Sequence, residues 1–209
     1  MSGSAGLATV ATNGSDTSDF NALSFVVEKI IGRKATATLV QVIACTNTGG
    51  LSPIGFVDVH PLVNQVDGSG KAVPHGTVFN LPYLRVQAGT NAVIMDPTPN
   101  DIGVAWFASS DISNVKVTRK QANPGSKRRF SMADGIYGMT VISASGGPPT
   151  QYIQFNSTGI NIVSPTQVSL SCAGHSVLIN STGVVIDGKV FLAHEHTNSG
   201  GSGIGGPVA

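Results

Sequence analysis

Apolar and polar residues alternate in short runs along most of this chain. Residues i and i+2 of a strand point to the same face, so this alternation is typical of half-buried strands. Turn residues such as Pro, Gly and Asn separate the runs. Between residues 35 and 119 the pattern predicts strands at 35–45, 54–61, 79–86, 92–95 and 102–109. Short strands at this spacing favour a small barrel.

One segment follows a helical period instead. Its apolar positions, at i, i+3 and i+4 spacing, are Phe20, Leu23, Val27, Ile30 and Ile31. Ser18 or Asp19 is suited to the N-cap, and Gly32 followed by two basic residues marks the end. The pattern predicts a helix over 19–34, the main helix of the chain, after an N-terminal arm at 1–18 that is rich in small and polar residues.

Beyond residue 136 the strand pattern continues while charge almost disappears. Only Asp187 and Lys189 are charged between residues 140 and 193. The predicted strands are 140–143, 151–156, 159–163, 167–171, 176–180 and 183–187. Residues 156–162 (Asn-Ser-Thr-Gly-Ile-Asn-Ile) recur at 180–186 as Asn-Ser-Thr-Gly-Val-Val-Ile, 24 residues later. An internal repeat of short strands is typical of a β-solenoid.

The repeat region has too few turns to form a stable solenoid from one chain. Three chains winding together would cover the free strand edges and bury the Val, Ile and Leu face. Composition agrees, because charged residues make up 11% of the chain against about 25% in ordinary soluble domains. Burial between subunits explains such a weakly charged surface, so we expect a homotrimer.

Charge is concentrated in one short segment. The chain carries 12 Lys and Arg against 11 Asp and Glu, and six of the basic residues fall in 116–129, where no acidic residue occurs. This cluster is compatible with a phosphate or nucleic-acid patch, a solvated loop, or contact with an acidic neighbouring subunit. Phe130 is the only adjacent aromatic residue, which disfavours stacking on bases, and we expect no nucleic-acid sequence recognition. Cys45 and Cys172 are expected to be small, buried, reduced residues.

The candidate metal ligands are His194 and His196, which lie two positions apart after the last predicted strand. In a strand these two side chains share a face, while Glu195 points the other way. Two imidazoles are too few for a closed metal site, whereas three copies around a threefold axis offer six. The other histidines, His60, His75 and His175, have no partner at metal-ligand spacing and are expected at the surface or in turns.

Three segments, residues 95–113, 127–138 and 184–196, carry a family resemblance. With them the chain resembles the central-spike proteins of contractile-tailed bacteriophages, a family also called baseplate assembly protein V or membrane-piercing spike proteins. The resemblance extends from about residue 20 onward. The most specific part is the ending, in which a β repeat is followed by His-x-His and a Gly-rich tail.

The resemblance implies an all-β homotrimer with an N-terminal OB-type barrel that docks on the tail hub and baseplate, and a C-terminal intertwined triple-stranded β-helix. At its apex, His194 and His196 of three chains would coordinate one iron ion per trimer. Six neutral imidazoles suit octahedral iron, whereas zinc prefers four ligands, and a site filled by protein is structural. The resemblance further implies assembly in the host cytoplasm, a place in the virion tail baseplate, and transient contact with the host outer membrane when the sheath contracts.

The expected organisation has five parts: an arm at 1–18, a helix at 19–34, a barrel at 35–135, a trimeric β-helix at 136–193 and a metal-binding apex with a Gly-rich tip at 194–209. We expect no enzymatic activity and no small-molecule substrate. Asp96 and Asp101, in a Pro-rich turn, are expected to cap backbone groups.

Two other functions remain open. A glycan- or receptor-binding tail fibre tip is also compatible with a trimeric β-helix, although residues 140–196 contain only Tyr152, Phe155 and Phe191 as aromatic side chains. A His-x-His metal hydrolase would need further ligands, and the 13 residues after His196 include no His or acidic residue.

Overall fold

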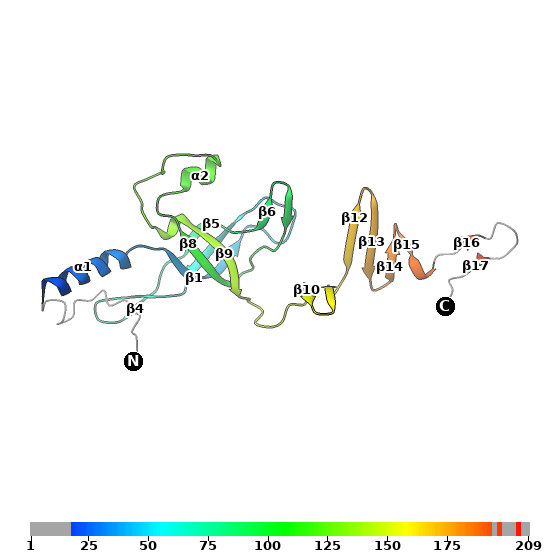
Figure 1. Ribbon diagram of the computed structural model, residues 1–209, viewed down its shortest axis with the longest axis horizontal. Coiled ribbons are helices and arrows are strands. Elements are labelled where there is room, and N and C mark those ends of the chain that lie inside the picture. The colour runs from blue at the N-terminus through cyan, green and yellow to red at the C-terminus, as the bar shows by residue number, and fades with distance from the viewer. Residues whose placement is uncertain (1–17, 194–195, 198–203, 206–209) are drawn as a thin grey trace. The chain divides into compact units, whose positions relative to one another are not determined.

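The computed structural model describes residues 18–193, 196–197 and 204–205. The described chain is mostly β-sheet, which confirms the all-β class (Figure 1). It divides into two compact units, Met1–Gly146 and Gly147–Ala209.

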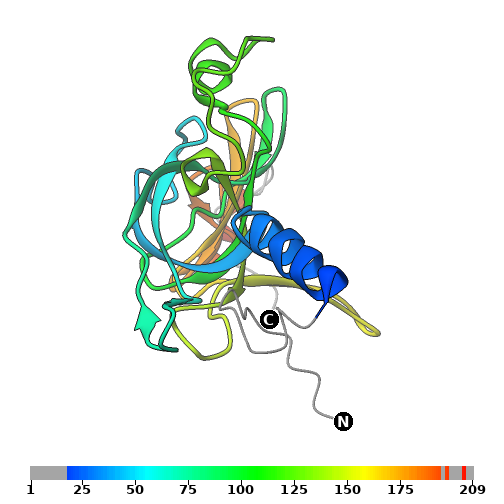
Figure 2. The same cartoon turned by 90° about the vertical axis from the view of Figure 1, so that its left-hand side faces the viewer.

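The N-terminal unit is built on a curved sheet of five antiparallel strands (Figure 2). Its order across the sheet is β5-β2-β1-β8-β9. The strands are β1 (Ala37–Cys45), β2 (Phe56–Pro61), β5 (Val78–Pro82), β8 (Ile102–Phe107) and β9 (Gly135–Ile142). Since each hairpin-like neighbour runs antiparallel, the sheet agrees with the strand-and-turn pattern of the sequence.

The core of this unit lies on one side of the sheet. On β1, Val40 and Val42 are fully buried, and Val42 lies opposite the fully buried Val59 of β2. The alternation of apolar residues along these strands therefore places one set of side chains inside. Leu81 and Tyr137, both fully buried, complete the centre of the core.

The two edges of the sheet meet at one point. A parallel bridge joins Tyr83, just after β5, to Tyr137 of β9, and the Leu84 amide donates to the Tyr137 carbonyl at 2.8 Å. In the described residues the sheet is not closed by a continuous ladder, so the expected barrel is found only as a curved sheet. The strand expected over 79–86 is divided for the same reason, because β5 ends at Pro82 before this bridge.

Short elements decorate the sheet. They are β3 (Gln65–Val66), β4 (Ala72–Val73), β6 (Val86–Ala88), β7 (Asn91–Val93), α2 (Ser113–Thr118) and η1 (Met132–Asp134). The turn between β3 and β4 is held by Asp67, whose Oδ1 accepts from the amides of Ser69 and Lys71, both at 2.9 Å. The helical turn α2 was not predicted, because its six residues are too short for a periodic pattern.

The predicted helix is confirmed as α1 (Asp19–Gly32). Ser18 is its N-cap, and Ser18 Oγ accepts from the Asn21 amide at 3.2 Å. The helix ends at Gly32, two residues before the expected position. No residue of α1, which the structure describes in full, is buried.

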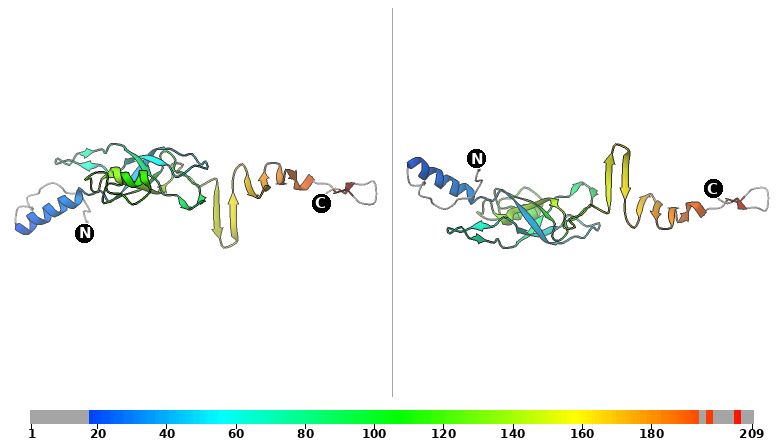
Figure 3. Two further views of the ribbon diagram at one scale, coloured as in Figure 1. Left: turned by 90° about the horizontal axis from the view of Figure 1, so that it is seen from above. Right: turned by 90° about the horizontal axis from the view of Figure 1, so that it is seen from below.

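The C-terminal unit is a succession of antiparallel hairpins (Figure 3). Strands β10 (Tyr152–Asn156) and β11 (Gly159–Val163) form a separate hairpin. A four-stranded meander follows, made of β12 (Val168–Cys172), β13 (His175–Asn180), β14 (Gly183–Ile186) and β15 (Lys189–Val190). The unit continues with η2 (Phe191–Ala193), β16 (His196–Thr197) and β17 (Ile204–Gly205).

The 24-residue repeat corresponds to a repeated turn. Asn156 Oδ1 accepts from the amides of Thr158 and Gly159 at 2.9 and 3.0 Å, and Asn180 Oδ1 accepts from the Thr182 amide at 2.9 Å. Each Asn lies opposite the Gly that starts the next strand, Asn156 opposite Gly159 and Asn180 opposite Gly183. Gly183 has a φ of +118°, a conformation that L side chains rarely adopt.

Two features of the β region differ from the sequence-based expectation. The N-terminal unit extends to Gly146 rather than to residue 135, because β9 pairs with β8 along its length. Within the meander, β13 pairs with β12 on one side and β14 on the other. Both edges of β13 are therefore occupied by its own chain, which leaves none for a strand of another chain.

Candidate functional site

The expected metal ligands fall at the margin of the described chain. His194 lies outside the described residues. His196 begins β16, where its Cα is paired with that of Gly205. Across the described residues no group of three or more His, Cys, Asp or Glu side chains is arranged to hold a metal ion.

His175 has a partner that the sequence did not indicate. Its Nδ1 lies 2.7 Å from Asp187 Oδ2, and Asp187 Oδ1 accepts from the Ser176 amide at 2.7 Å. These hydrogen bonds, from Ser176 first and then His175, lower the pKa of the Asp187 carboxyl. The pair joins the turn before β13 to the turn after β14. His175 is an exposed surface residue, as expected, and its role here is to hold two neighbouring turns together.

The C-terminal unit carries a surface that looks unfinished in a single chain. On the β10–β11 hairpin, Ile153 lies opposite Ile162, and Phe155 lies opposite Ile160. Their exposed fractions are between 54% and 75%. On the other face, Asn161 Nδ2 donates to Gln154 Oε1 at 3.3 Å. One face of the hairpin is therefore wholly apolar, and the opposite face is polar.

The β12–β15 meander has the same property. Its register places one set of apolar side chains on a common face: Val168, Leu170, Val177, Ile179, Val184 and Ile186. Cys172, the exposed and free cysteine, lies on this face, so the expectation that both cysteines are buried is wrong for Cys172. We refer to this face, together with that of the β10–β11 hairpin, as the apolar face.

No residue between positions 147 and 192 is buried. A two-stranded hairpin alone is at best marginally stable in water, and a single sheet layer has no second layer to cover it. Large exposed apolar patches mark interaction surfaces in folded proteins. The apolar face is therefore the strongest candidate functional surface of the described chain.

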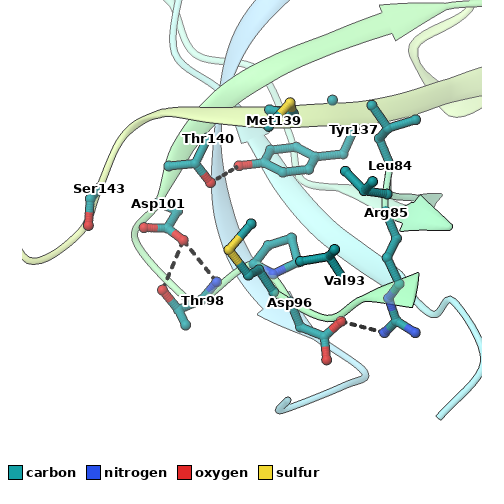
Figure 4. A pocket seen from close by; sticks show the side chains of 14 residues that line it. Leu84, Arg85, Val93, Asp96, Thr98, Asp101, Tyr137, Met139, Thr140 and Ser143 are labelled. Atoms are coloured by element: carbon teal, nitrogen blue, oxygen red, sulfur yellow. Dashed lines mark hydrogen bonds and ion pairs between the residues drawn. The ribbon is translucent and has the colours of Figure 1, made fainter. Parts of the chain in front are cut away.

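A second candidate is a cavity of about 360 Å³ in the N-terminal unit (Figure 4). Its walls include Asp101, Tyr137 and Met139. Asp101 Oδ2 accepts from the Thr98 amide and hydroxyl at 3.0 and 2.9 Å, and its Oδ1 accepts from the Ala144 amide at 2.8 Å. Asp101 caps backbone groups, as predicted, and it fastens the end of β9 to the loop before β8.

The titration of these cavity groups follows from their surroundings. Burial raises the pKa of the Asp101 carboxyl, but the hydrogen bonds from Ala144 and Thr98 outweigh burial, so its pKa is lowered. Burial raises the pKa of Tyr137, whose hydroxyl lies 3.2 Å from Thr140 Oγ1. A carboxylate that is stably charged and fully hydrogen-bonded serves the structure better than proton transfer.

Asp96 lies at the same cavity, but it forms an ion pair rather than a turn cap. Its Oδ1 is 2.5 Å from Arg85 Nη2 and accepts from the Tyr83 hydroxyl at 2.6 Å. The Gly49 amide donates to Asp96 Oδ2 at 2.8 Å, and Arg85 Nη1 donates to the Ser52 carbonyl at 2.7 Å. The paired side chains are only 2% and 1% exposed.

This buried cluster holds the loop around residues 49–52 against the sheet. Burial raises the pKa of Asp96, but the hydrogen bonds from Tyr83 and Arg85 outweigh it, and the net pKa is lowered. Sequence reasoning missed the pair because the partners meet only in the folded sheet. The available signal was Arg85, a single charge inside the otherwise uncharged segment 79–86.

The basic cluster at 116–129 divides into two groups. Arg128 Nη2 is 3.0 Å from Asp111 Oδ2 and 3.1 Å from Asp134 Oδ1, so Arg128 fastens this loop to the sheet. Hydrogen bonds from Ser113 and Ser126 hold the pKa of Asp111 well below its usual range. The exposed members, on the loop that contains α2 in Figure 1, are Arg119, Lys120, Lys127 and Arg129.

No family model matches the chain, and no curated protein matches it. No helix in the described ranges is both long enough and apolar enough to cross a membrane.

Proposed function

We propose that this chain is a structural, trimeric spike protein of a contractile phage tail, which pierces the host outer membrane when the sheath contracts. The observation that carries the proposal is the apolar face, which is exposed along residues 147–192 although its side chains alternate as those of a buried strand do. Three copies of the chain would cover this face by turning it toward a common axis.

The arrangement of the strands favours a particular form of trimer. Because β13 is paired on both sides within its own chain, each chain would supply a complete sheet to the β-helix. The three sheets would then enclose a core of Val, Ile and Leu, with the Ser, Asn and Gln side chains outside. This arrangement replaces the interleaving of single strands that the sequence suggested.

The N-terminal unit supports a second part of the proposal. The strand order β5-β2-β1-β8-β9, together with the parallel approach of Tyr83 and Tyr137, agrees with the five-stranded, partly open OB-type barrel. In a spike this barrel would dock on the tail hub and baseplate proteins.

His194 and His196 would hold one iron ion per trimer at the apex. The donor set fits this ion, since three chains provide six imidazole nitrogens, which suits octahedral coordination. The ion would add binding energy to the closure of three chain ends. His196 lies on the short strand β16, after the end of the apolar face, where little side-chain packing is left to hold the chains together.

Light scattering combined with elemental analysis tests the proposal. We expect a mass of about 64 kDa, three times that of the 21.3 kDa chain, and one iron per three chains. Replacing both His194 and His196 with Ala should remove the iron, whereas His175→Ala, the control for a surface histidine, should retain it. A stable monomer would exclude the spike, and one metal ion per chain would contradict the shared site.

A further inference from the structure

Helix α1 exposes an apolar surface that no other described part of the chain covers. The exposed fractions are 76% for Phe20, 64% for Leu23, 49% for Val26, 44% for Val27, 54% for Ile30 and 61% for Ile31. A helix on the surface of a globular domain normally turns such residues toward the core. In α1 they face outward, so the helix is built to contact something else.

The spacing of these residues indicates what that contact is. Phe20, Leu23, Val27 and Ile30 are separated by three, four and three positions, which is the a and d spacing of a coiled coil. Val26 and Ile31 widen this seam on both sides, so that the apolar stripe spans about 140° of the helix circumference. The stripe carries no charge, and Glu28 and Lys29 lie on the opposite side of the helix.

We propose that α1 packs against α1 of two further copies of this chain, forming a parallel three-helix bundle. This inference rests on the proposed trimer. A seam of a and d residues alone matches one neighbouring helix, whereas a stripe widened on both flanks has surface for two. Rotation about a threefold axis relates identical helices in the same direction, so the bundle is parallel.

The length of α1 explains why the bundle needs the rest of the chain. A helix of 14 residues is marginal in isolation, and so is a two-heptad seam. Contact along the apolar face of the C-terminal unit would raise the effective concentration of the three helices toward one another. The trimer is then held at two places in the sequence, before β1 and after β9, with the curved sheets between them.

Disulfide trapping in the full chain tests the bundle. In a background with Cys45→Ala and Cys172→Ser, one variant carries Ile30→Cys in the seam and a matched variant carries Lys29→Cys, one position away on the opposite side. Mild oxidation should convert up to two thirds of the Ile30→Cys chains to covalent dimers, with at least a tenfold lower yield for Lys29→Cys. Ile30 is near the C-terminal end of α1, so it meets its own copy only in a parallel bundle.

Light scattering on the same samples separates the two levels of the inference. If both variants are trimers and Ile30→Cys cross-links no better than Lys29→Cys, the bundle is overturned while the spike trimer stands. The stripe then covers a neighbouring sheet or a baseplate protein instead. If the unmodified chain is a monomer, the proposed function fails, and the bundle fails with it.

Discussion

The two units of this protein use the same alternation of apolar and polar residues with opposite results. In the N-terminal unit, Val40 and Val42 of β1 are fully buried beneath a curved sheet. In the C-terminal unit, Ile153 and Ile162 share a face in the same way, yet they are 62% and 54% exposed. The difference shows that alternation predicts which side chains share a face, but not whether the same chain covers that face.

The two units also differ in how their loops are held. Buried ionised groups, Arg85 with Asp96 and the carboxylate of Asp101, fasten the loops of the N-terminal unit. In the C-terminal unit the turns are held by short-range hydrogen bonds from Asn156 and Asn180. One unit is therefore organised by contacts distant in sequence, and the other by local turns that leave the apolar face to a partner.

The largest effect is expected from a charge placed on the apolar face. Ile162→Asp would bring three carboxylates into the proposed shared core, where unpaired charges are strongly disfavoured. We expect loss of the trimer by light scattering, with unchanged Trp106 fluorescence from the N-terminal unit. Asn161→Asp, on the polar face, is the control and should remain trimeric. A trimeric Ile162→Asp protein would show that this face is not covered by other copies.

A smaller effect, confined to the N-terminal unit, is expected from a cavity in its core. Leu81 is fully buried, and Leu81→Ala should lower the free energy of unfolding by about 2–5 kcal/mol. Leu51, which is 97% exposed, provides the control, with an expected change of at most about 0.5 kcal/mol for Leu51→Ala. Urea unfolding followed by Trp106 fluorescence measures both. Equal effects would contradict the assignment of the core.

Asp101→Asn tests the polar fastening of the N-terminal unit. At pH 7 we expect a loss of about 1–3 kcal/mol, because Asn offers one acceptor oxygen where the carboxylate accepts three hydrogen bonds. The folded-state pKa of Asp101 is lowered, so its contribution is present above the unfolded pKa of about 3.9 and is lost as the pH falls through the folded pKa. Urea midpoints should therefore converge for the two proteins below about pH 4. A gap that stays constant with pH would argue against this role.

The smallest effect is expected in a turn of the C-terminal unit. Gly183 has a φ of +118°, so Gly183→Ala should destabilise the unit by about 1 kcal/mol per chain through backbone strain. Gly68→Ala, in a turn with open space around the added methyl group, serves as the control and should change little. Thermal unfolding of the assembled protein measures the difference. A Gly183→Ala protein as stable as the control would show that this turn relaxes freely.

Much of the fold could be predicted from the sequence because its determinants are local. The helix over 19–34 was found as Asp19–Gly32, since Ser18 and the apolar spacing both act within one or two turns. The strands of the repeat were found close to their predicted positions, because Asn156 and Asn180 define their turns through hydrogen bonds two or three residues away. Such features do not depend on the rest of the fold.

The features that escaped prediction depend on distant parts of the chain. Asp96 was expected to cap its own turn, but Arg85 and Tyr83 reach it only once β5 and the following segment are in place. Arg128 looked like one member of a solvated cluster, although Asp111 and Asp134 bind it from two sides. The iron-binding site stays a prediction, because His194 lies outside the described residues and the site needs three chains.

The repeated turn also makes the length of the β region adjustable. Because Asn156-Ser-Thr-Gly159 and Asn180-Ser-Thr-Gly183 form the same turn 24 residues apart, removal of residues 157–180 would join Asn156 to Ser181 and regenerate that turn unchanged. Duplication of the same residues would add one such step. Gene duplication or deletion in this region can therefore shorten or lengthen the rod in fixed increments, with each strand keeping its turn chemistry and its apolar side.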